Sequence, residues 1–294
     1  MRKFLIFALL FPTFGSIRAQ QKDWLDSLGA ESHVSQKVSG AFKSTRVINA
    51  HSIEMLGKHS MDLRILHRFG NISLGIKQLY GFDIASMRLG FDYGINDNLM
   101  VGIGRSTFRK ELDAFTKIRL LQQARGLKSV PFSVLLAVGG TVWTEQSFDS
   151  VKPGFADRAS VYLQFIIGRK FTQNISLQLS PIWINSGKAV NSGIDPGVIA
   201  LGGGGRIKFT KRMAFTFDYH HPLGVMKPGN KSPLSVGVDI ETGGHVFQLH
   251  FSNTAGMNER AYITQTTNDF LKGEIRFGFN LSRMFHFGST SARR

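Results

Sequence analysis

The sequence has no cysteine among its 294 residues, which excludes disulfide bonds, zinc–thiolate sites, iron–sulfur clusters and thiol nucleophiles. Acidic residues are few: 20 Asp and Glu stand against 36 Lys and Arg, so the formal net charge is +16. After the N-terminus no apolar run approaches the roughly 20 residues that a helix needs to cross a bilayer. The hydrophobic content of 42% nevertheless excludes a disordered chain, which would have too little apolar surface to bury.

Glycine, by contrast, is abundant, with 32 residues. An interior glycine destabilises a helix by about 1 kcal/mol relative to alanine, so this content disfavours a helical bundle. The glycines follow no Gly-X-Y period, which excludes collagen.

The first residues have the features of a signal peptide. Arg2 and Lys3 precede an apolar stretch at 4–14, and Ala19 ends the segment with a small residue. The apolar stretch is too short to span a bilayer as a helix, and no cysteine is present for a lipid anchor. We therefore expect a signal peptide at 1–19 and an exported protein, with a polar periplasmic lead-in at 20–45, a barrel at 46–287 and a C-terminal tail at 288–294.

Apolar and polar residues alternate with period two along much of the chain. In 59–69, for example, Met61, Leu63 and Ile65 fall on one face and Asp62 and Arg64 on the other. This pattern is typical of membrane β-barrels, whose strands present apolar residues to lipid and polar residues to the lumen. Nine segments share it: 59–69, 85–95, 112–121, 161–168, 175–180, 213–220, 235–241, 245–252 and 270–285. Additional candidates are 47–56, 99–108, 130–145 and 197–210.

These candidates predict the fold class: all-β, a single transmembrane antiparallel up-and-down β-barrel. Thirteen strands would not close a bacterial barrel, because such barrels have an even number of strands. We expect twelve strands, with fourteen as the next count. Short turns such as 96–98, 210–212 and 243–244 alternate with longer loops such as 70–84 and 253–269, as expected for the periplasmic and extracellular ends of an outer-membrane barrel.

The polar face of the alternation carries charges of both signs. The candidate lumen-facing residues are Arg64, Arg68, Arg88, Asp92, Lys117, Arg119, Asp218, His220, Asp239, Glu241, Lys272, Glu274 and Arg276. In one interpretation they line a water-filled passage that favours anions. In the other they pair across the lumen and fill it, as side chains do in barrels of small strand number.

Three other motifs invite chemical interpretations. The glycine run 202–205 leads into Arg206 rather than Lys-Ser/Thr and continues as a strand, which excludes a P-loop and favours a glycine-lined strand that leaves room for a neighbouring ring. Asp218 and His220 supply fewer ligands than a zinc site needs. His250 and Ser252 lie roughly 7 Å apart along a strand, too far apart for a nucleophile and its base.

Short motifs along the chain carry a family resemblance. They lie at 42–49 (FKSTRVIN), 67–70 (HRFG), 81–83 (GFD), 88–90 (RLG), 92–94 (DYG), 101–106 (VGIGRS), 251–254 (FSNT) and 278–283 (GFNLSR). Through them the sequence resembles an uncharacterised family of Bacteroidetes-type outer-membrane β-barrels, a domain of unknown function, over about 42–285. The resemblance implies a barrel in the cell outer membrane and supplies no catalytic residue.

These observations predict a non-enzymatic outer-membrane barrel, with no cofactor, metal ion or catalytic residue. One functional hypothesis is a narrow channel for small or anionic solutes. The alternative is a closed structural or interaction barrel that serves a periplasmic or surface partner, and a lipid-modifying enzyme is a distant third. Expected partners are outer-membrane lipid and the barrel-assembly machinery, which would read the C-terminal strand ending near Phe285 and Phe287. Nucleic acid is not expected, because the basic residues are dispersed and not gathered with stacking aromatics.

Overall fold

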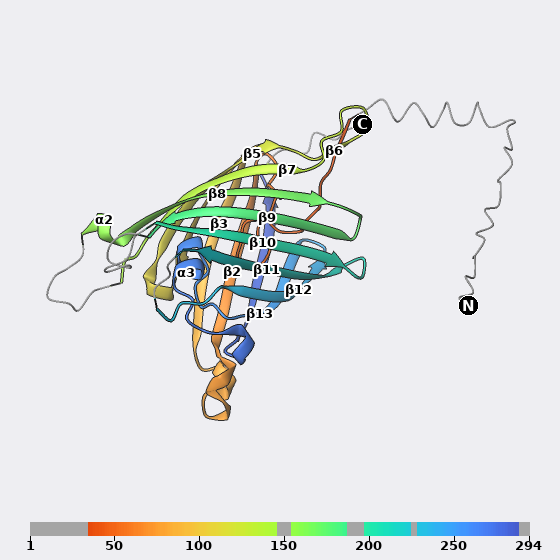
Figure 1. Cartoon of the computed structure of the whole chain (residues 1–294). Coiled ribbons are helices and arrows are strands. Elements are labelled where there is room, and N and C mark those ends of the chain that lie inside the picture. Colours follow the sequence, from red (N-terminus) through yellow and green to blue (C-terminus); the bar gives the residue numbers. More distant parts are fainter. Residues whose placement is uncertain (1–34, 146–153, 187–196, 225–227, 288–294) are drawn as a thin grey trace, which may run out of the picture.

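The chain forms one closed barrel of antiparallel strands, shown in Figure 1. The computed structural model describes residues 35–145, 154–186, 197–224 and 228–287. The signal peptide, most of the lead-in and the C-terminal tail expected from the sequence lie outside these residues. The barrel strands are β2 (Ser60–Asn71), β3 (Ala85–Asn96), β4 (Leu99–Ser106), β5 (Leu112–Leu121), β7 (Ser133–Val142), β8 (Ala159–Lys170), β9 (Ile175–Asn185), β10 (Gly197–Lys208), β11 (Met213–Leu223), β12 (Leu234–Thr242), β13 (His245–Ser252) and β14 (Arg276–His286).

Each strand pairs with its neighbour in the chain, and the first strand, β2, pairs with the last, β14. The twelve-strand antiparallel barrel expected from the sequence is therefore confirmed. A separate short sheet joins β1 (Gln36–Lys37) to β6 (Ala124–Arg125). Closure leaves no unpaired edge in the barrel wall, which is what a strand needs where no water can satisfy its backbone.

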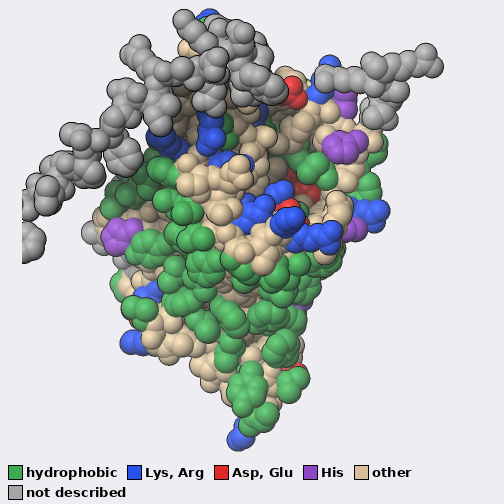
Figure 2. Space-filling model, turned by 90° about the vertical axis from the view of Figure 1, so that its right-hand side faces the viewer, with side chains coloured by type: hydrophobic (Ala, Val, Ile, Leu, Met, Phe, Trp, Pro, Cys, Tyr) green, Lys and Arg blue, Asp and Glu red, His purple; other side chains and the backbone are tan. Residues whose placement is uncertain are grey.

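The period-two pattern sets which side chains face outward. Along β2, buried residues alternate with partly exposed ones from Ser60 to Phe69. Along β8, Val161, Leu163, Phe165 and Ile167 are 38–52% exposed. Together such residues form an apolar belt around the barrel, visible as the hydrophobic surface in Figure 2, and a lipid-facing wall requires this belt.

The two mouths of the barrel differ in their connections. We call one mouth the turn end, where 97–98, 171–174, 209–212 and 243–244 join neighbouring strands, and the other the loop end, where 72–84, 107–111 and 253–275 do so. The loop end also carries α3 (Glu259–Thr264), which lies at the barrel mouth, and the lobe formed by η2 (Ile72–Leu74) and η3 (Ile76–Gly81), which projects beyond it in Figure 1. Among the described residues, no helix is both long and apolar enough to cross a membrane.

Two strand predictions are wrong. Residues 47–56 are not a wall strand, and their removal from the thirteen candidates leaves the even number that closes the barrel. The last strand begins at Arg276 and not near 270, because residues 270–272 form the short helical turn η5 (Phe270–Lys272) and Gly273 then adopts the left-handed conformation. Chance alternation in this loop extended the predicted strand.

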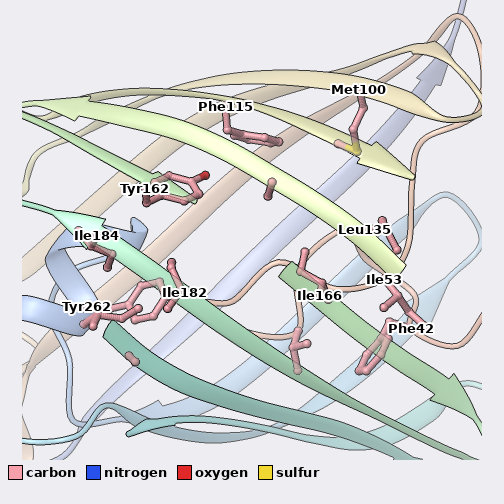
Figure 3. Close-up of a cluster of buried hydrophobic side chains, with 14 of the residues drawn as sticks. Phe42, Ile53, Met100, Phe115, Leu135, Tyr162, Ile166, Ile182, Ile184 and Tyr262 are labelled. Carbon is pink, nitrogen blue, oxygen red and sulfur yellow. The ribbon is translucent and has the colours of Figure 1, made fainter. Parts of the chain in front are cut away.

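The lumen contains a hydrophobic core, unlike the water-filled interior of an open barrel. Figure 3 shows Phe42 and Ile53, which precede the first barrel strand, in one buried cluster with wall residues such as Leu135 and Ile166. Tyr262 of α3 belongs to the same cluster. Segments from both mouths therefore fill the interior of the barrel.

Candidate functional site: a plugged lumen

The segment 41–56 runs inside the barrel and is named here the plug. It enters from the turn end, where the Lys170 ammonium donates a hydrogen bond to the carbonyl of Ser39 (3.0 Å). It returns to the same end, where His59 N–H bonds to the carbonyl of Gly94. At its tip, two backbone hydrogen bonds of 2.9 Å, from Val47 to Ala50 and from Ser52 to Thr45, close a tight hairpin.

Asp218 of β11 holds the turn of this hairpin. One of its carboxylate oxygens, Oδ2, accepts the backbone N–H groups of Ile48, Asn49 and Ala50 at 3.2, 2.7 and 3.3 Å. Successive N–H groups that converge on one carboxylate form an anion-binding concavity. Since Asp218 and Asn49 are 1% and 0% exposed, this contact is sheltered from water.

Wall side chains satisfy the rest of the plug backbone. The amide of Gln178 donates to the carbonyl of His51 (2.7 Å), and that of Asn280 donates to the carbonyl of Ile48 (3.0 Å). The ammonium of Lys117 donates to the carbonyls of Thr45 and Glu54 at 3.2 and 2.7 Å. A buried backbone without such partners would be costly, so the wall and the plug are chemically matched.

Charged wall residues predicted from the sequence take part in this packing. Arg64 pairs with Asp62 (2.6 Å) and donates to the Thr45 hydroxyl of the plug (2.6 Å). The same hydroxyl donates to Asp92 (3.1 Å). Arg68 donates to the side-chain carbonyl of Asn49 (2.8 Å). Most of the predicted lumen-facing charges that lie inside the barrel therefore contact the plug or one another.

Two further predicted residues pair within the wall. Arg88 forms a two-point contact with Asp113, at 2.8 Å from Nε and 2.5 Å from Nη2. Asp239 accepts from Thr216 (3.3 Å) and Gln248 (3.0 Å), and its carboxylate lies 3.9 Å from Arg206. Buried charges are tolerated when they are paired and hydrogen-bonded, and these are.

Four of the remaining predicted residues lie away from the plug tip. Glu241 pairs with Arg206 (2.9 Å) and Lys43 (2.9 Å) near the turn end, and Arg119 donates to the carbonyl of Asp97 (3.0 Å) at the same end. Lys272 is exposed in η5 and Glu274 lies in the loop after it. The prediction that Lys272 and Glu274 are lumen-facing strand residues is wrong, because β14 starts only at Arg276.

A second segment meets the plug from the loop end. Glu259, the first residue of α3, forms an ion pair with Arg46 of the plug (2.7 Å) and lies 3.3 Å from the His51 ring. Burial and the Arg46 guanidinium hold the pKa of His51 well below its usual range. The next residue of α3, Arg260, pairs with Glu111 in the loop before β5. This helix therefore connects the plug tip to the loop end of the wall.

Glycines on the lumen face make room for bulky groups. A Cβ at Gly104 would lie 2.2 Å from the guanidinium of Arg88, and one at Gly202 would lie 2.5 Å from the His220 ring. The glycine run 202–205 is thus part of a strand that leaves space for a neighbouring ring, as predicted. His220 itself packs edge-on against Tyr262 of α3, with ring centroids 5.1 Å apart.

Among the described residues, the geometry supports neither a metal site at Asp218 and His220 nor a nucleophile–base pair at His250 and Ser252. Within the part of the chain that the structure describes, no three His, Asp or Glu residues are arranged to hold a metal ion. Ser252 is fully buried and bonds to the Ser235 hydroxyl (2.8 Å), while His250 Nδ1 lies 3.2 Å from its own strand's Gln248 carbonyl. The pair His250 and Ser252 is therefore engaged in packing.

Sequence reasoning missed the residues that fill the lumen. Arg46 and Asn49 fell in a segment predicted to be a lead-in and strand, and Glu259 in a segment predicted to be a loop. Their contacts join residues far apart in the chain: Asn49 and Asp218 are 169 positions apart, and Arg46 and Glu259 are 213. The one available signal was the odd count of strand candidates.

An all-antiparallel closed barrel with an apolar outer belt is the architecture of a membrane-bound β-barrel protein. The chain matches DUF5777, described as a membrane-bound β-barrel domain, over residues 42–285. It belongs to this family, and the match covers all of the plug except its first residue. The Bacteroidetes-type origin stays a prediction.

Comparison with curated proteins gives no match. Among solved structures the chain is similar to the KdgM porin, with 10% identity, a TM-score of 0.45 and coverage of 77% of this chain and 99% of the porin. For the NanC porin the values are 8%, 0.46, 78% and 100%. For Omp33 of Acinetobacter baumannii they are 7%, 0.43, 78% and 99%. At this level of similarity no transport property of these proteins carries over.

Proposed function

We propose that this chain is a non-enzymatic barrel of the outer membrane that is closed by its own plug and acts by binding partners at its ends. The observation that carries the proposal is the plug tip: a hairpin whose turn is bound by Asp218 and whose Arg46 is paired with Glu259. These buried contacts hold the plug in one defined position inside the barrel. A freely conducting pore would not need a plug fixed in this way.

The turn end supplies the surface for a partner. Lys37, Arg125, Lys170 and Lys208 line a shallow pocket of about 370 Å³ there. Figure 2, which looks onto this side of the molecule, shows Lys and Arg side chains gathered beside the barrel. A basic surface attracts and steers a partner of opposite charge, so the proposed periplasmic partner is acidic at its contact surface.

A channel for small or anionic solutes, gated by the plug, is the second candidate. It is favoured by the path of the plug, which enters and leaves by the same mouth and so can move out as a loop. Withdrawal would leave Lys117 and Arg68 facing water without the plug oxygens that they now contact. Asp218 and Asp92 would lose their plug partners in the same step, so the opened passage would carry charges of both signs.

Conductance in a planar bilayer tests the closed state. We expect the full-length protein to be silent, and a variant with residues 42–55 replaced by a Gly/Ser linker to conduct. The matched control replaces residues 76–81 of the loop-end lobe in the same way and should remain silent. Steady openings of the unaltered protein would overturn the closed barrel and favour the channel.

Charge reversal tests the partner surface. Lys170→Glu combined with Lys208→Glu should abolish crosslinking of a periplasmic protein to the barrel in cells, whereas Lys77→Glu in the loop-end lobe should not. Equal crosslinking by both variants would exclude the turn end as the contact surface.

A further inference from the structure

A pocket of about 520 Å³ opens at the loop end. Five described segments build it: η4 (Phe108–Lys110), the loops at 228–230 and 253–255, the chain at the end of α3 and just after it, and the start of β14. Its volume is in the range of small-molecule sites and exceeds what a single inorganic ion needs. It is separate from the plug contacts and from the basic surface of the turn end.

Two arginines face this pocket. Arg109 and Arg276 both line it, and none of the described lining residues is a carboxylate. Among the described residues neither arginine forms an ion pair, although ten such pairs occur elsewhere. Each guanidinium is nevertheless positioned: that of Arg109 lies over the Trp143 ring (5.1 Å to the centroid), and Nη1 of Arg276 donates to the carbonyl of Phe69 (3.2 Å).

An arginine without a protein carboxylate is suited to a ligand carboxylate. The planar guanidinium presents donors in a fork that matches carboxylate geometry. The contact of Arg109 with the Trp143 ring uses no N–H hydrogen bond, so its donors stay available. The pocket therefore has positioned cationic groups that have no counter-ion among the described residues.

The rest of the lining is neutral and rich in amides and hydroxyls. The amides and hydroxyls include those of Asn230, Gln265, Thr266 and Thr267. The side-chain oxygen of Gln265 is buried and has no hydrogen-bond partner among the described residues. Amide and hydroxyl groups recognise hydroxyls by hydrogen bonding, and Phe108 adds an aromatic face.

We propose that this pocket binds a small, hydroxyl-rich carboxylate of the sugar-acid class, with Arg109 and Arg276 on the carboxylate and the amides and hydroxyls on the ring hydroxyls. The inference goes beyond the proposed function, since a closed barrel needs no such site. It also does not depend on whether the plug can move, because every lining residue lies outside the plug.

Calorimetric titration of the folded, detergent-solubilised full-length protein tests the site. The probes are glucuronate, glucose, acetate and inorganic phosphate. We expect glucuronate to bind at least tenfold more tightly than the other three, and Arg109→Gln or Arg276→Gln to weaken it at least tenfold. Lys272→Gln, which removes an exposed charge at the same end, should leave binding unchanged.

Trp143 gives a second readout, because a ligand on Arg109 should alter its fluorescence. Heat-modified migration in electrophoresis verifies that each variant is folded. Equal affinity for glucose and glucuronate would overturn the role of the arginines, and tighter binding of phosphate than glucuronate would overturn the sugar-acid class. Loss of binding in Lys272→Gln as large as in Arg109→Gln would reduce the site to general charge attraction and also overturn the proposal.

Discussion

The backbone N–H of Asn49 donates to the carboxylate of Asp218 across the lumen at 2.7 Å. The first is at the tip of the plug and the second is on β11 of the wall. Because the same oxygen also accepts the N–H groups of Ile48 and Ala50, one side chain stabilises the whole hairpin turn.

Replacing this carboxylate should release the plug. Hydrogen bonds to a charged group contribute about 1.5–3 kcal/mol each, and the three share one acceptor oxygen. We therefore expect Asp218→Ala to lower the free energy of unfolding by about 2–3 kcal/mol and to expose the plug to protease. Denaturation from lipid vesicles and limited proteolysis measure the two effects. Asp218→Asn keeps an acceptor, so its free energy of unfolding should fall between those of Asp218→Ala and the unaltered protein.

Breaking the ion pair between Arg46 and Glu259 should be more costly than removing both partners. A single change leaves a buried charge unpaired, which destabilises by about 3–5 kcal/mol. We expect Glu259→Gln to weaken the plug strongly and the double variant Glu259→Gln/Arg46→Met to recover part of the loss. A double-mutant cycle on denaturation midpoints checks this, and additive effects would show that the pair is not coupled.

The glycines of the wall offer a matched comparison. A Cβ at Gly104 would collide with the Arg88 guanidinium, whereas one at Gly203 would meet nothing within 4 Å. Overpacking a well-packed interior costs about 1–3 kcal/mol, so Gly104→Ala should destabilise the barrel by that amount. Gly203→Ala, on the outer face of the same barrel, should be neutral or stabilising. Similar losses for both variants would mean that backbone freedom matters and the close approach does not.

A crosslink can separate the closed barrel from the gated channel. The sequence has no cysteine, so an introduced pair has no competitor. The Asn49 amide donates to the Ser235 hydroxyl at 2.8 Å, so these side chains are in contact, and Asn49→Cys/Ser235→Cys is the pair to introduce, with disulfide formation measured first. If the plug opens, any conductance seen in reducing buffer should disappear on oxidation, while each single variant should be insensitive. A closed barrel stays silent in both conditions.

The wall was predictable because its pattern is local. In β2, residues two positions apart face the same side, so the alternation of Met61 and Leu63 with Asp62 and Arg64 is sufficient to identify the strand and its faces. The plug was not predictable by the same rule. A segment surrounded by wall on every side has no lipid face and no lumen face, so the apolar residues Val47 and Ile53 imitate a strand.

The partners of the lumen charges could not be read from the sequence either. Asp218 falls on the polar face of β11 in the pattern, but nothing local identifies the hairpin that it binds. Likewise, alternation near Lys272 continued past the true start of β14, because periodicity does not register the left-handed turn at Gly273. The sequence pattern predicts which face of a strand a residue occupies. The residues that contact that face are set by closure of the barrel.

The pairing of β2 with β14 has a consequence for biogenesis. The plug immediately precedes the first strand, yet side chains that hold its tip, among them Asp218, Gln248 and Asn280, come from the second half of the chain. During synthesis the plug is therefore made before the wall residues that bind it. An intermediate lacking β14 would have an open seam and an unsecured plug, so completion of the wall and burial of the plug are expected to be one cooperative event.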